Sequence, residues 1–449
     1  MQVYPHVEID GQKRLVIGGI EASKLARKFG TPLYVYSEDA IVDRMREYVL
    51  TMRDLYPFGH VAYASKAYLT LRMAQLVAEE GLWLDVVSGG ELFIAMKGGF
   101  PPERIIFHGN NKTFEELEMA VAAGVGRIVI DSLDEIKRIE RVAAQKKRRQ
   151  DVLLRLTPGI DAHTHKALAT GEIDSKFGIP MHQNQHVQAA LMVLQAPHLN
   201  FLGVHCHIGS QIFETAPFAM AVKTMLNFIF EFQKRTGILI SELDLGGGLG
   251  VPYTEEEPEL GVKPYLEVIT STLLSESERF GLPPLRLFVE PGRSIVAQAG
   301  VTLYRVGTVK ELPNGTVVAA VDGGMADNPR PMLYGAKYRA ILVTGGRDRS
   351  PRPVRIVGRN CEEGDTLIEE AWLPPLRPGD ILAVLVTGAY QYSMSSNYNA
   401  LPRPAVVHVR DGQALLVVER EKYADLILRQ RLVTPVKSMN STNAKSASF

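Results

Sequence analysis

The chain has 449 residues, of which 46% are hydrophobic and 22% are charged. This composition is that of a globular protein and excludes wholesale disorder, and the length exceeds the roughly 100 to 200 residues of one domain, so two domains are expected. Fifty Lys and Arg balance fifty Asp and Glu, giving a formal net charge of zero. No global field therefore attracts nucleic acid or an anionic membrane.

The cysteine content and the apolar runs indicate a compartment. The two cysteines, Cys206 and Cys361, are too few for a disulfide scaffold and are typical of a reducing environment. The first residues lack the apolar core of a signal peptide, and no apolar run approaches the roughly 20 residues of a membrane span. We therefore expect a soluble cytoplasmic protein.

Short apolar or β-branched runs alternate with helical patterns from about residue 60, which predicts parallel strands joined by crossover helices. Eight such runs can be counted, namely Val61–Ala64, Leu84–Val87, Arg104–Phe107, Arg127–Ile130, Val152–Leu156, Phe201–His205, Glu242–Leu245 and Arg286–Glu290. Eight strands over about 250 residues are typical of a closed barrel. The sequence therefore predicts an α/β protein with a (β/α)8 TIM-like barrel over residues 37–300.

Two of the expected helices have distinctive ends. Thr113–Ala123 opens with a cap signal and acidic residues in its first turn, and Gly124 suits its C-terminus. A second helical stretch, Leu133–Gln150, ends in KKRRQ. We interpret this basic run as a solvated helix end, favoured by the helix dipole, and not as a binding patch.

After about residue 300 the pattern becomes β-rich, with Gly, Pro and Asn turns and little helical periodicity. The expected strands are Val317–Val321, Ala340–Val343, Val354–Val357, Ile381–Val386, Ala405–Val409 and Ala414–Val418. We predict a C-terminal antiparallel β-domain over residues 301–435, with N-terminal strands from residues 1–36 packing against it. Residues 436–449 are small and polar and are expected to be disordered.

Reactive residue types follow the predicted barrel strands, where catalytic groups of such barrels gather. Lys66 follows the first strand, and a desolvated lysine there would lose its proton more easily and form a Schiff base, unless it is a surface residue. Residues 246–248 are glycines whose N–H groups would cradle a phosphate or only form a turn. Glu290 ends the predicted eighth strand, and Arg293 lies three residues later. The carboxylate suits a cationic ring nitrogen and the guanidinium suits an anion, unless the two form a salt bridge with each other.

Histidines provide an alternative interpretation. His205 and His207 share one face of a strand, His163 and His165 repeat the spacing, and such pairs bind metal. A metal-dependent barrel hydrolase is therefore a rival. The sequence offers no further obvious cluster to complete the metal site, and this hypothesis leaves Lys66 and the glycines unexplained. We therefore expect no metal.

The two cysteines are expected to differ in environment. Cys206 points away from its histidine neighbours and is expected to be a packed core thiol. Cys361 lies in a polar loop of the second domain, where a thiol gains little from burial. A reactive or proton-donating role and an accidental cysteine both remain open for it.

Eight ordered motifs together resemble the fold-type III, pyridoxal-phosphate-dependent decarboxylases, over residues 32–403. They are YASKA (63–67), SKFGI (175–179), GVHCHIGSQI (203–212), DLGGGLG (244–250), EPGRSIVAQAG (290–300), DGGMADNPRPMLYGAKY (322–338), CEEGD (361–365) and GAYQYSMSSNYN (388–399). The resemblance implies an alanine racemase-like barrel followed by a β-domain, in agreement with the strand pattern.

The resemblance also implies pyridoxal 5'-phosphate as the cofactor. Lys66 matches the lysine that carries it, His207 the histidine stacked on its ring, and Glu290 the carboxylate that pairs with its ring nitrogen, while Asp85 is a further candidate for the cofactor site. The implied phosphate contacts are Ser210, Gly246, Gly247, Gly248, Gly292, Arg293 and Tyr390.

Within the family, the motifs are most similar to those of members that act on meso-2,6-diaminopimelate. Such an enzyme releases carbon dioxide and L-lysine, the last step of lysine biosynthesis. The implied contacts to the distal amino-carboxylate end are Arg293, Arg330, Tyr334, Glu362 and Tyr390. Rivals are related decarboxylases of ornithine, lysine, arginine or carboxynorspermidine, and a non-catalytic cofactor-binding homologue.

The resemblance implies an obligate homodimer, because Cys361 and Glu362 reach the active site of the other subunit in this family. Either Cys361 or Lys66 would return the proton after decarboxylation. The familiar loop reads Cys-Glu-Ser, whereas Glu363 follows here. Since a further acid would repel a dicarboxylate, we expect Glu363 to point away from the site.

Overall fold

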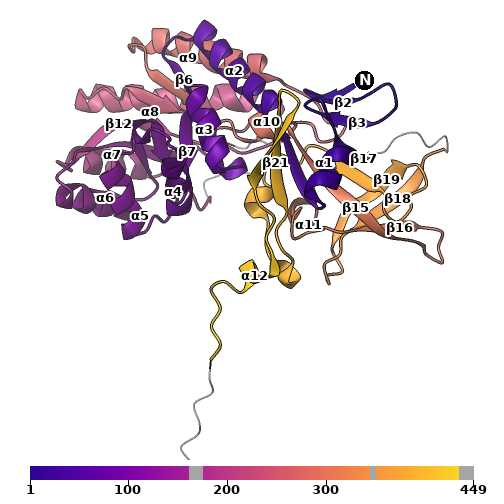
Figure 1. Ribbon diagram of the computed structural model, residues 1–449. Helices are drawn as coiled ribbons and strands as arrows, with labels where there is room; N and C mark the ends of the chain where they lie inside the picture. Colours follow the sequence, from indigo (N-terminus) through magenta and orange to yellow (C-terminus); the bar gives the residue numbers. More distant parts are fainter. Residues whose placement is uncertain (161–174, 344–349, 434–449) are drawn as a thin grey trace, which may run out of the picture.

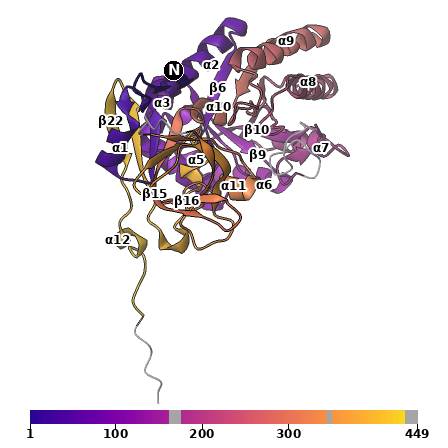
Figure 2. The same ribbon diagram turned by 90° about the vertical axis from the view of Figure 1, so that its right-hand side faces the viewer.

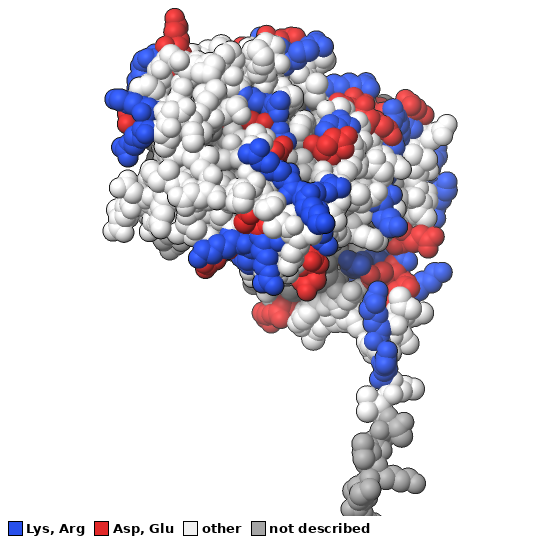
Figure 3. All heavy atoms as spheres, turned by 90° about the vertical axis from the view of Figure 1, so that its left-hand side faces the viewer, with Lys and Arg blue, Asp and Glu red and all other residues white. Residues whose placement is uncertain are grey.

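The computed structural model describes residues 1–160, 175–343 and 350–433 (Figure 1). An eight-stranded parallel barrel surrounded by helices lies beside a mixed β-sheet. Within the described residues, no helix is long and apolar enough to cross a membrane. Acidic and basic side chains both occur on the barrel face that Figure 3 presents.

The barrel is closed by parallel pairing of neighbouring strands. Its strands, in chain order, are β6 (Gly59–Ala64), β7 (Trp83–Val86), β8 (Ile105–Phe107), β9 (Arg127–Ile130), β10 (Gln150–Thr157), β12 (Leu199–His205), β13 (Glu242–Asp244) and β14 (Arg286–Val289). The β9–β10 and β14–β6 pairs complete the ring, and β11 (Ile179–Pro180) adds to the end of β10. All eight predicted strands, and the barrel they form, are confirmed.

Alternation along the strands separates two layers of core. One cluster packs with the helices, and a second holds residues at alternate strand positions: Ala62, Ile106, Val129, Leu153 and Phe288. The helices around the ring are α2 (Glu38–Leu55), α3 (Leu71–Glu79), α4 (Gly89–Lys97), α5 (Phe114–Ala123), α6 (Leu133–Gln145), α7 (Gln185–Leu194), α8 (Ala216–Thr236), α9 (Val262–Phe280) and the short α10 (Arg293–Val296).

Of the two helices whose ends were predicted, one ends where expected and the other ends earlier. Thr113 caps α5 through a capping box with Glu116, and Gly124 closes it in the left-handed conformation at φ 77°, as predicted. Helix α6 was expected to reach Gln150 but ends at Gln145, because the basic residues form an exposed turn and Gln150 already opens β10. Their exposure fits a solvated surface.

The second sheet has the order β19-β18-β16-β15-β5-β21-β22, with β17 and β20 joined to one side. Figure 2 labels its strands β15, β16 and β22. Its strands are β5 (Leu33–Ser37), β15 (Gly300–Glu311), β16 (Val317–Val321), β17 (Ala340–Leu342), β18 (Arg352–Val357), β19 (Thr366–Leu373), β20 (Ile381–Val384), β21 (Ala405–Arg410) and β22 (Gln413–Val418). Most pairs are antiparallel, whereas β5–β21 and β16–β18 are parallel. The predicted β-domain therefore exists, with β15 and β19 as strands that the sequence reading omitted.

The N-terminal strands divide between two sheets. The first four, β1 (Gln2–Tyr4), β2 (Val7–Ile9), β3 (Leu15–Ile17) and β4 (Ile20–Glu21), form a sheet of their own before helix α1 (Ala22–Phe29). Only β5, which follows α1, is inserted into the large sheet between β15 and β21. The domain boundaries at residues 37, 300 and 435 stay predictions, and the predicted tail, residues 436–449, lies outside the described residues.

A buried ionic cluster joins the barrel to the second sheet. Glu38 at the start of α2 is fully buried and accepts hydrogen bonds from His408 and Arg410 of β21 and from Arg72 of α3, at 3.0, 2.9 and 2.6 Å. Burial alone would raise the pKa of Glu38, but these hydrogen bonds outweigh it and lower the pKa. The junction therefore depends on an ionised carboxylate.

We expect Glu38→Gln to lower the free energy of unfolding by about 3 kcal/mol at pH 7, because it removes the buried charge that accepts hydrogen bonds from the partly exposed guanidiniums of Arg72 and Arg410. Since the folded pKa of Glu38 lies below its ordinary value, its contribution is present above a pH of about 4 and is lost on further acidification. Thermal unfolding at pH 7 and pH 4 should therefore show a difference from wild type that shrinks at the lower pH. Glu47→Gln, on the surface of the same helix, is the matched control; an equal effect there would contradict the prediction.

Candidate active site

A cavity of about 170 Å³ opens where several barrel strands end, at the edge where such barrels carry their catalytic groups. It is lined from β6, β12, β13 and β14 together with segments of the second domain. The lining residues are Ala64, Lys66, His207, Ser210, Gly247, Gly248, Leu249, Glu290, Pro291, Gly292, Arg293, Ser294, Arg330, Tyr334, Tyr390 and Met394. The structure thus brings most of the predicted site residues together.

Lys66 lies in a single 3-10 turn, η1 (Ser65–Ala67), directly after β6. Its side chain is 41% exposed, and its Nζ lies 3.6 Å from Oδ2 of Asp85, a buried residue of β7. Burial lowers the pKa of Lys66, but the charge of Asp85 leads the neighbours that raise it, and the net shift is upward. The expectation that desolvation makes this amine lose its proton more easily is therefore wrong here, because the sequence did not reveal how close Asp85 lies.

Glu290 is held between two imidazoles directly after β14. Its Oε1 lies 2.7 Å from Nε2 of His108, and its Oε2 lies 3.2 Å from Nε2 of His205. Burial alone would raise the pKa of Glu290, but the two histidines outweigh it and hold the pKa well below its ordinary value. Because Glu290 meets histidines and lines the cavity, the alternative of a salt bridge with Arg293 is not what the structure shows.

His205 and His207 have different neighbours, although they are only two residues apart. Burial lowers the pKa of His205 to about 3, so it is neutral and donates to Glu290 through Nε2. His207 lines the cavity instead, and burial, followed by the charge of Lys66, holds its pKa well below the ordinary value. Gly246, at φ 63°, leaves room for this ring, because a Cβ there would lie 2.7 Å from Nδ1 of His207.

Arg293 begins helix α10 and is buried at one end of the cavity. Its guanidinium donates to the hydroxyl of Ser210 at 3.0 Å and to that of Tyr253 at 2.7 Å. Neutral hydroxyls leave the positive charge available, so this end of the cavity suits an anion. Gly247 belongs to the same wall, where a Cβ would lie 2.4 Å from the carbonyl oxygen of Glu290.

A second buried guanidinium comes from the β-domain side. Arg330 opens the short helix α11 (Arg330–Tyr334), and its Nε has no hydrogen-bond partner among the described residues. The guanidinium lies over the rings of Tyr334, Tyr390 and Tyr253, at 5.1, 5.5 and 6.0 Å from their centroids. Tyr390 has φ 62°, a conformation that is uncommon outside glycine and is found at functional sites.

Asp85 and Gly246 lie behind the lining of the cavity, beside Lys66 and His207, whereas two other predicted residues lie away from it within one chain. Cys361 and Glu362 are exposed and are absent from the lining of the cavity. The backbone N–H of Cys361 donates to Asn399, and the hydroxyl of Tyr398 donates to Glu362 at 3.3 Å. Cys206, by contrast, is fully buried, and burial raises the pKa of its thiol, as expected for a core cysteine.

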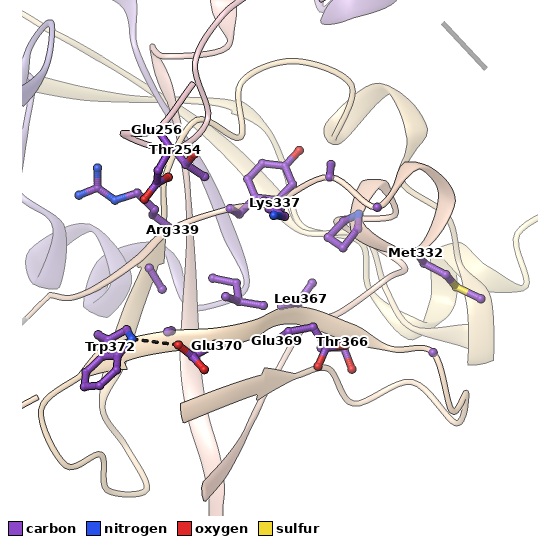
Figure 4. A pocket seen from close by; sticks show the side chains of 18 of the residues that line it. Thr254, Glu256, Met332, Lys337, Arg339, Thr366, Leu367, Glu369, Glu370 and Trp372 are labelled. Carbon is purple, nitrogen blue, oxygen red and sulfur yellow. Dashed lines mark hydrogen bonds between the residues drawn. The ribbon is translucent and has the colours of Figure 1, made fainter. Parts of the chain in front are cut away.

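A larger groove of about 1080 Å³ lies outside the barrel mouth (Figure 4). Thr254 and Glu256 form one part of its wall, β19 with Thr366 and Leu367 another, and Met332 of α11 lies toward one end. At the other end Trp372 is 65% exposed and donates to Glu370 at 3.0 Å. Glu363 lines this groove and not the Lys66 cavity of its own chain, and its expected direction away from the site of a second subunit stays a prediction.

The structure corrects the expectation that no further cluster accompanies the histidines. His108, His205, Asp244 and Glu290 are all buried, and their ligand atoms lie within 4.8 Å of one another. His163 and His165 lie outside the described residues. The sequence reading missed this cluster because the strand ends that hold His108 and Asp244 converge only when the barrel closes. Inspection of the residue after every predicted strand, the third included, finds His108.

Tyr253 was also missed. It follows the glycine loop in sequence, and its hydroxyl accepts a hydrogen bond from Arg293. No motif singles out this tyrosine, and its role depends on the path of the loop after Gly250.

Comparisons with known proteins agree with this geometry. Residues 40–297 match the family model described as pyridoxal-dependent decarboxylase, pyridoxal binding domain. The chain is 48% identical over 413 residues to the diaminopimelate decarboxylase of Bacillus subtilis (strain 168), with 92% of this chain and 94% of that protein covered. The chain is also 43% identical over 423 residues to the diaminopimelate decarboxylase of Staphylococcus aureus (strain COL), with 94% of this chain and 99% of that protein covered.

Solved structures lead to the same family. The diaminopimelate decarboxylase of M. jannaschii, in complex with L-lysine, has a TM-score of 0.90 at 36% identity, with 96% of this chain and 99% of that chain covered. A lysine/ornithine decarboxylase of Vibrio vulnificus has a TM-score of 0.71 at 21% identity, which shows a shared fold alone. Because a family model covers more than half of the chain and near full-length relatives exceed 40% identity, the chain belongs to the pyridoxal-dependent decarboxylases and, within them, to the diaminopimelate decarboxylases.

Proposed function

We propose that this chain removes one carboxylate of meso-2,6-diaminopimelate as carbon dioxide and leaves L-lysine, with pyridoxal 5'-phosphate as its cofactor. The observation that carries the substrate assignment is Arg330, a buried cation whose Nε has no partner among the described residues. Its described neighbours are tyrosines, including Tyr338, which is hydrogen-bonded to Arg330, and these tyrosines supply no negative charge. A buried cation without a counter-ion costs free energy, so an anion is expected to complete the site. The distal carboxylate of the substrate supplies that anion.

The residues around the cavity fit the cofactor. An amine for its aldehyde comes from Lys66, donors for its phosphate from Ser210, Arg293 and the glycines at 247 and 248, and a carboxylate for its ring nitrogen from Glu290. When bound, the cofactor ring accepts the electron pair left behind by the departing carboxylate. The glycine loop supports this assignment, because a Cβ at Gly247 or Gly246 would fill space that the neighbouring backbone and His207 already occupy.

Each of these residues has a separate task in the proposed reaction. Lys66 attaches the cofactor, and its Nζ, beside Asp85, is placed to hold or release a proton. Glu290, kept ionised by its two imidazoles, keeps the ring nitrogen protonated. His207 is neutral, so its ring packs in the cavity without adding a charge that would oppose Lys66. Tyr390 adds a hydroxyl at the phosphate end.

Selectivity follows from the second carboxylate. Arg330, with Tyr334 and Tyr390 beneath its guanidinium, would bind the distal end of a diamino dicarboxylate. Lysine and ornithine lack that carboxylate and would leave Arg330 desolvated and unpaired. A site built around such a contact discriminates against the analogue that lacks it by about 10⁴-fold.

The assignment is tested by incubating the purified, cofactor-loaded protein with meso-diaminopimelate and identifying the product by mass spectrometry and chiral chromatography. L-lysine and carbon dioxide in equal amounts are the expected result. Absence of lysine under conditions in which the cofactor remains bound would refute the proposed function. The cytoplasmic location that the cysteine content predicts is part of the same proposal.

A homodimer with shared active sites is also part of the proposal. The exposed loop of Cys361 and Glu362 lies beside α11, since a Cβ at Gly364 would be 3.4 Å from the Met332 side chain. Helix α11 carries Arg330 on the cavity side and Met332 on the groove side. A second copy seated over this region by a twofold axis would bring its own Cys361 and Glu362 toward the cavity, where Glu362 would receive the distal ammonium.

Cys361→Ala is expected to lower kcat by about 10²- to 10⁴-fold, the usual contribution of a proton donor, while the dimer still assembles. Mixing it with Lys66→Ala under conditions that exchange subunits should restore activity up to about a quarter of wild type, because half of the dimers then hold one intact site. Sedimentation confirms assembly. No recovery on mixing two impaired variants would contradict the shared site, whereas an unchanged kcat for Cys361→Ala alone would exclude Cys361 as the proton donor.

A further inference from the structure

His108 follows β8 directly and occupies a position between two carboxylates beneath the cavity. Its Nε2 lies 2.7 Å from Oε1 of Glu290 and 3.8 Å from Oδ1 of Asp85. The side chain is only 5% exposed, and its backbone N–H donates to the carbonyl of Val86 at 2.8 Å, which fixes the residue against β7. His108 does not line the cavity, so any effect on bound molecules passes through its neighbours.

The contact with Glu290 fixes both the charge and the plane of that carboxylate. A carboxylate only accepts hydrogen bonds, so Nε2 of His108 carries the hydrogen that it donates to Oε1. His205 binds the other oxygen at 3.2 Å, and the two imidazoles meet edge to face with centroids 4.8 Å apart. Glu290 therefore cannot rotate about its last bond without losing two hydrogen bonds in a buried site.

Of the two histidines, His108 forms the shorter hydrogen bond to Glu290, and it also lies near Asp85. Through Asp85 it connects the Glu290 end of the cavity to Lys66, whose Nζ lies 3.6 Å from the other oxygen of Asp85. Oδ1 of Asp85 is buried and has no hydrogen-bond partner among the described residues, and His108 lies 3.8 Å from it. The titratable groups that act on Glu290 and Asp85 from the surrounding elements are Lys66, His108, Arg155, His205 and Asp244.

We propose that His108 is a positioning residue for the decarboxylation, which holds the Glu290 carboxylate ionised and aimed at the ring nitrogen of the cofactor. This inference rests on the proposed function, because it concerns the same cofactor. His205 is the secondary support, since its hydrogen bond to Glu290 is longer, 3.2 Å against 2.7 Å. Without His108, the ionised form of Glu290 would lose a hydrogen bond in a desolvated site and become less stable. Glu290 would then pair less well with the ring nitrogen.

The test compares three variants of the full-length holoenzyme. His108→Phe removes the donor and keeps a ring, while His108→Gln keeps an N–H at the same reach. His198→Phe is the matched control, because His198 forms a similar imidazole–carboxylate contact with Glu140 at 2.6 Å on the surface. For each variant the measurements are kcat and KM for meso-diaminopimelate, the affinity of the apoprotein for pyridoxal 5'-phosphate, and the pH dependence of the absorbance of the bound cofactor.

The expected result for His108→Phe is a fall in kcat of about 10- to 100-fold with KM changed less than threefold, because a hydrogen bond to a charged group is worth about that factor. The pH midpoint of the cofactor absorbance should shift, and cofactor affinity should fall. His108→Gln should recover most of both, and His198→Phe should match wild type. If the role of His108 were merely structural, His108→Phe would lower the stability of the protein but would not shift the pH midpoint of the absorbance. His108→Gln would then not be expected to restore kcat.

Three outcomes overturn the inference: an unchanged kcat in His108→Phe, an unshifted absorbance midpoint, or a His108→Gln protein as impaired as His108→Phe. If His108→Phe does not fold, ¹⁵N spectra of the wild-type holoenzyme decide, because the proposal requires hydrogen on Nε2 of His108 across neutral pH. Wild-type turnover in the same assay separates the two proposals. If wild type makes no lysine, the proposed function fails, whereas cofactor affinity and absorbance still test His108.

Discussion

Lys66→Ala is expected to lower kcat by at least about 10³-fold and to remove the absorbance of covalently attached cofactor, because Lys66 is the amine that lines the cavity beside the proposed ring site. The cofactor should still bind, since Arg293, Ser210 and the glycine loop remain. Absorbance after dialysis and borohydride reduction followed by peptide mass spectrometry measure the attachment. Lys97→Ala, on the exposed side of α4, is the control.

Retained turnover in Lys66→Ala would end the proposed mechanism. Loss of turnover in both lysine variants would point instead to a general folding defect, which circular dichroism resolves. The upward pKa shift of Lys66 concerns the free amine beside Asp85 and does not lessen the need for an amine at this position.

Arg330→Ala is expected to raise KM for meso-diaminopimelate by about 10- to 100-fold, because charge-assisted hydrogen bonds to the distal carboxylate are lost. The change in kcat should be small, since that end of the substrate is bound equally in the ground state and in the transition state. Steady-state kinetics with cofactor in excess gives both constants. Arg330→Lys should also be impaired, because an ammonium on a flexible stem cannot replace a guanidinium laid over three tyrosine rings.

Arg339→Ala is the matched control for Arg330, because Arg339 pairs with Glu255 at 2.6 Å away from the Lys66 cavity. Its KM should equal that of wild type. Cofactor loss in Arg330→Ala, measured as lower absorbance after gel filtration, would mean that Arg330 binds the phosphate and that the substrate assignment is wrong.

The barrel could be predicted from sequence because its signals are local. Each parallel strand is a short apolar run buried on both faces, and each helix between the strands has its own period and caps, as α5 shows. The second sheet was less predictable. β15 begins with a buried run at the barrel boundary and continues into a largely exposed half, and β19 has the exposed Glu369 and Glu370 between buried residues, so neither is a short apolar run with clear ends.

The site residues divide in the same way. Lys66, Glu290 and Arg293 lie in contiguous motifs and were found. His108, Tyr253 and the closeness of Asp85 to Lys66 depend on barrel closure, which places residues far apart in sequence within hydrogen-bond reach. Burial does lower the pKa of Lys66, as the sequence argument holds, but the carboxylate of Asp85, which sequence spacing did not reveal, reverses the net shift. The roles of Cys361 and Glu362 depend on a second subunit and stay predictions.

The most direct test of the proposed function is a competition in one reaction vessel. Equal concentrations of meso-diaminopimelate, LL-diaminopimelate, L-lysine and L-ornithine, each carrying a different isotope label, are supplied to the cofactor-loaded protein. Mass spectrometry then assigns every product to its source, which measures the ratio of kcat/KM values. We predict L-lysine formed from the meso isomer, with cadaverine and putrescine lower by about 10⁴-fold. Cadaverine or putrescine as the main product would contradict the assignment of Arg330 to a second carboxylate, while leaving the fold and the Lys66 site in place.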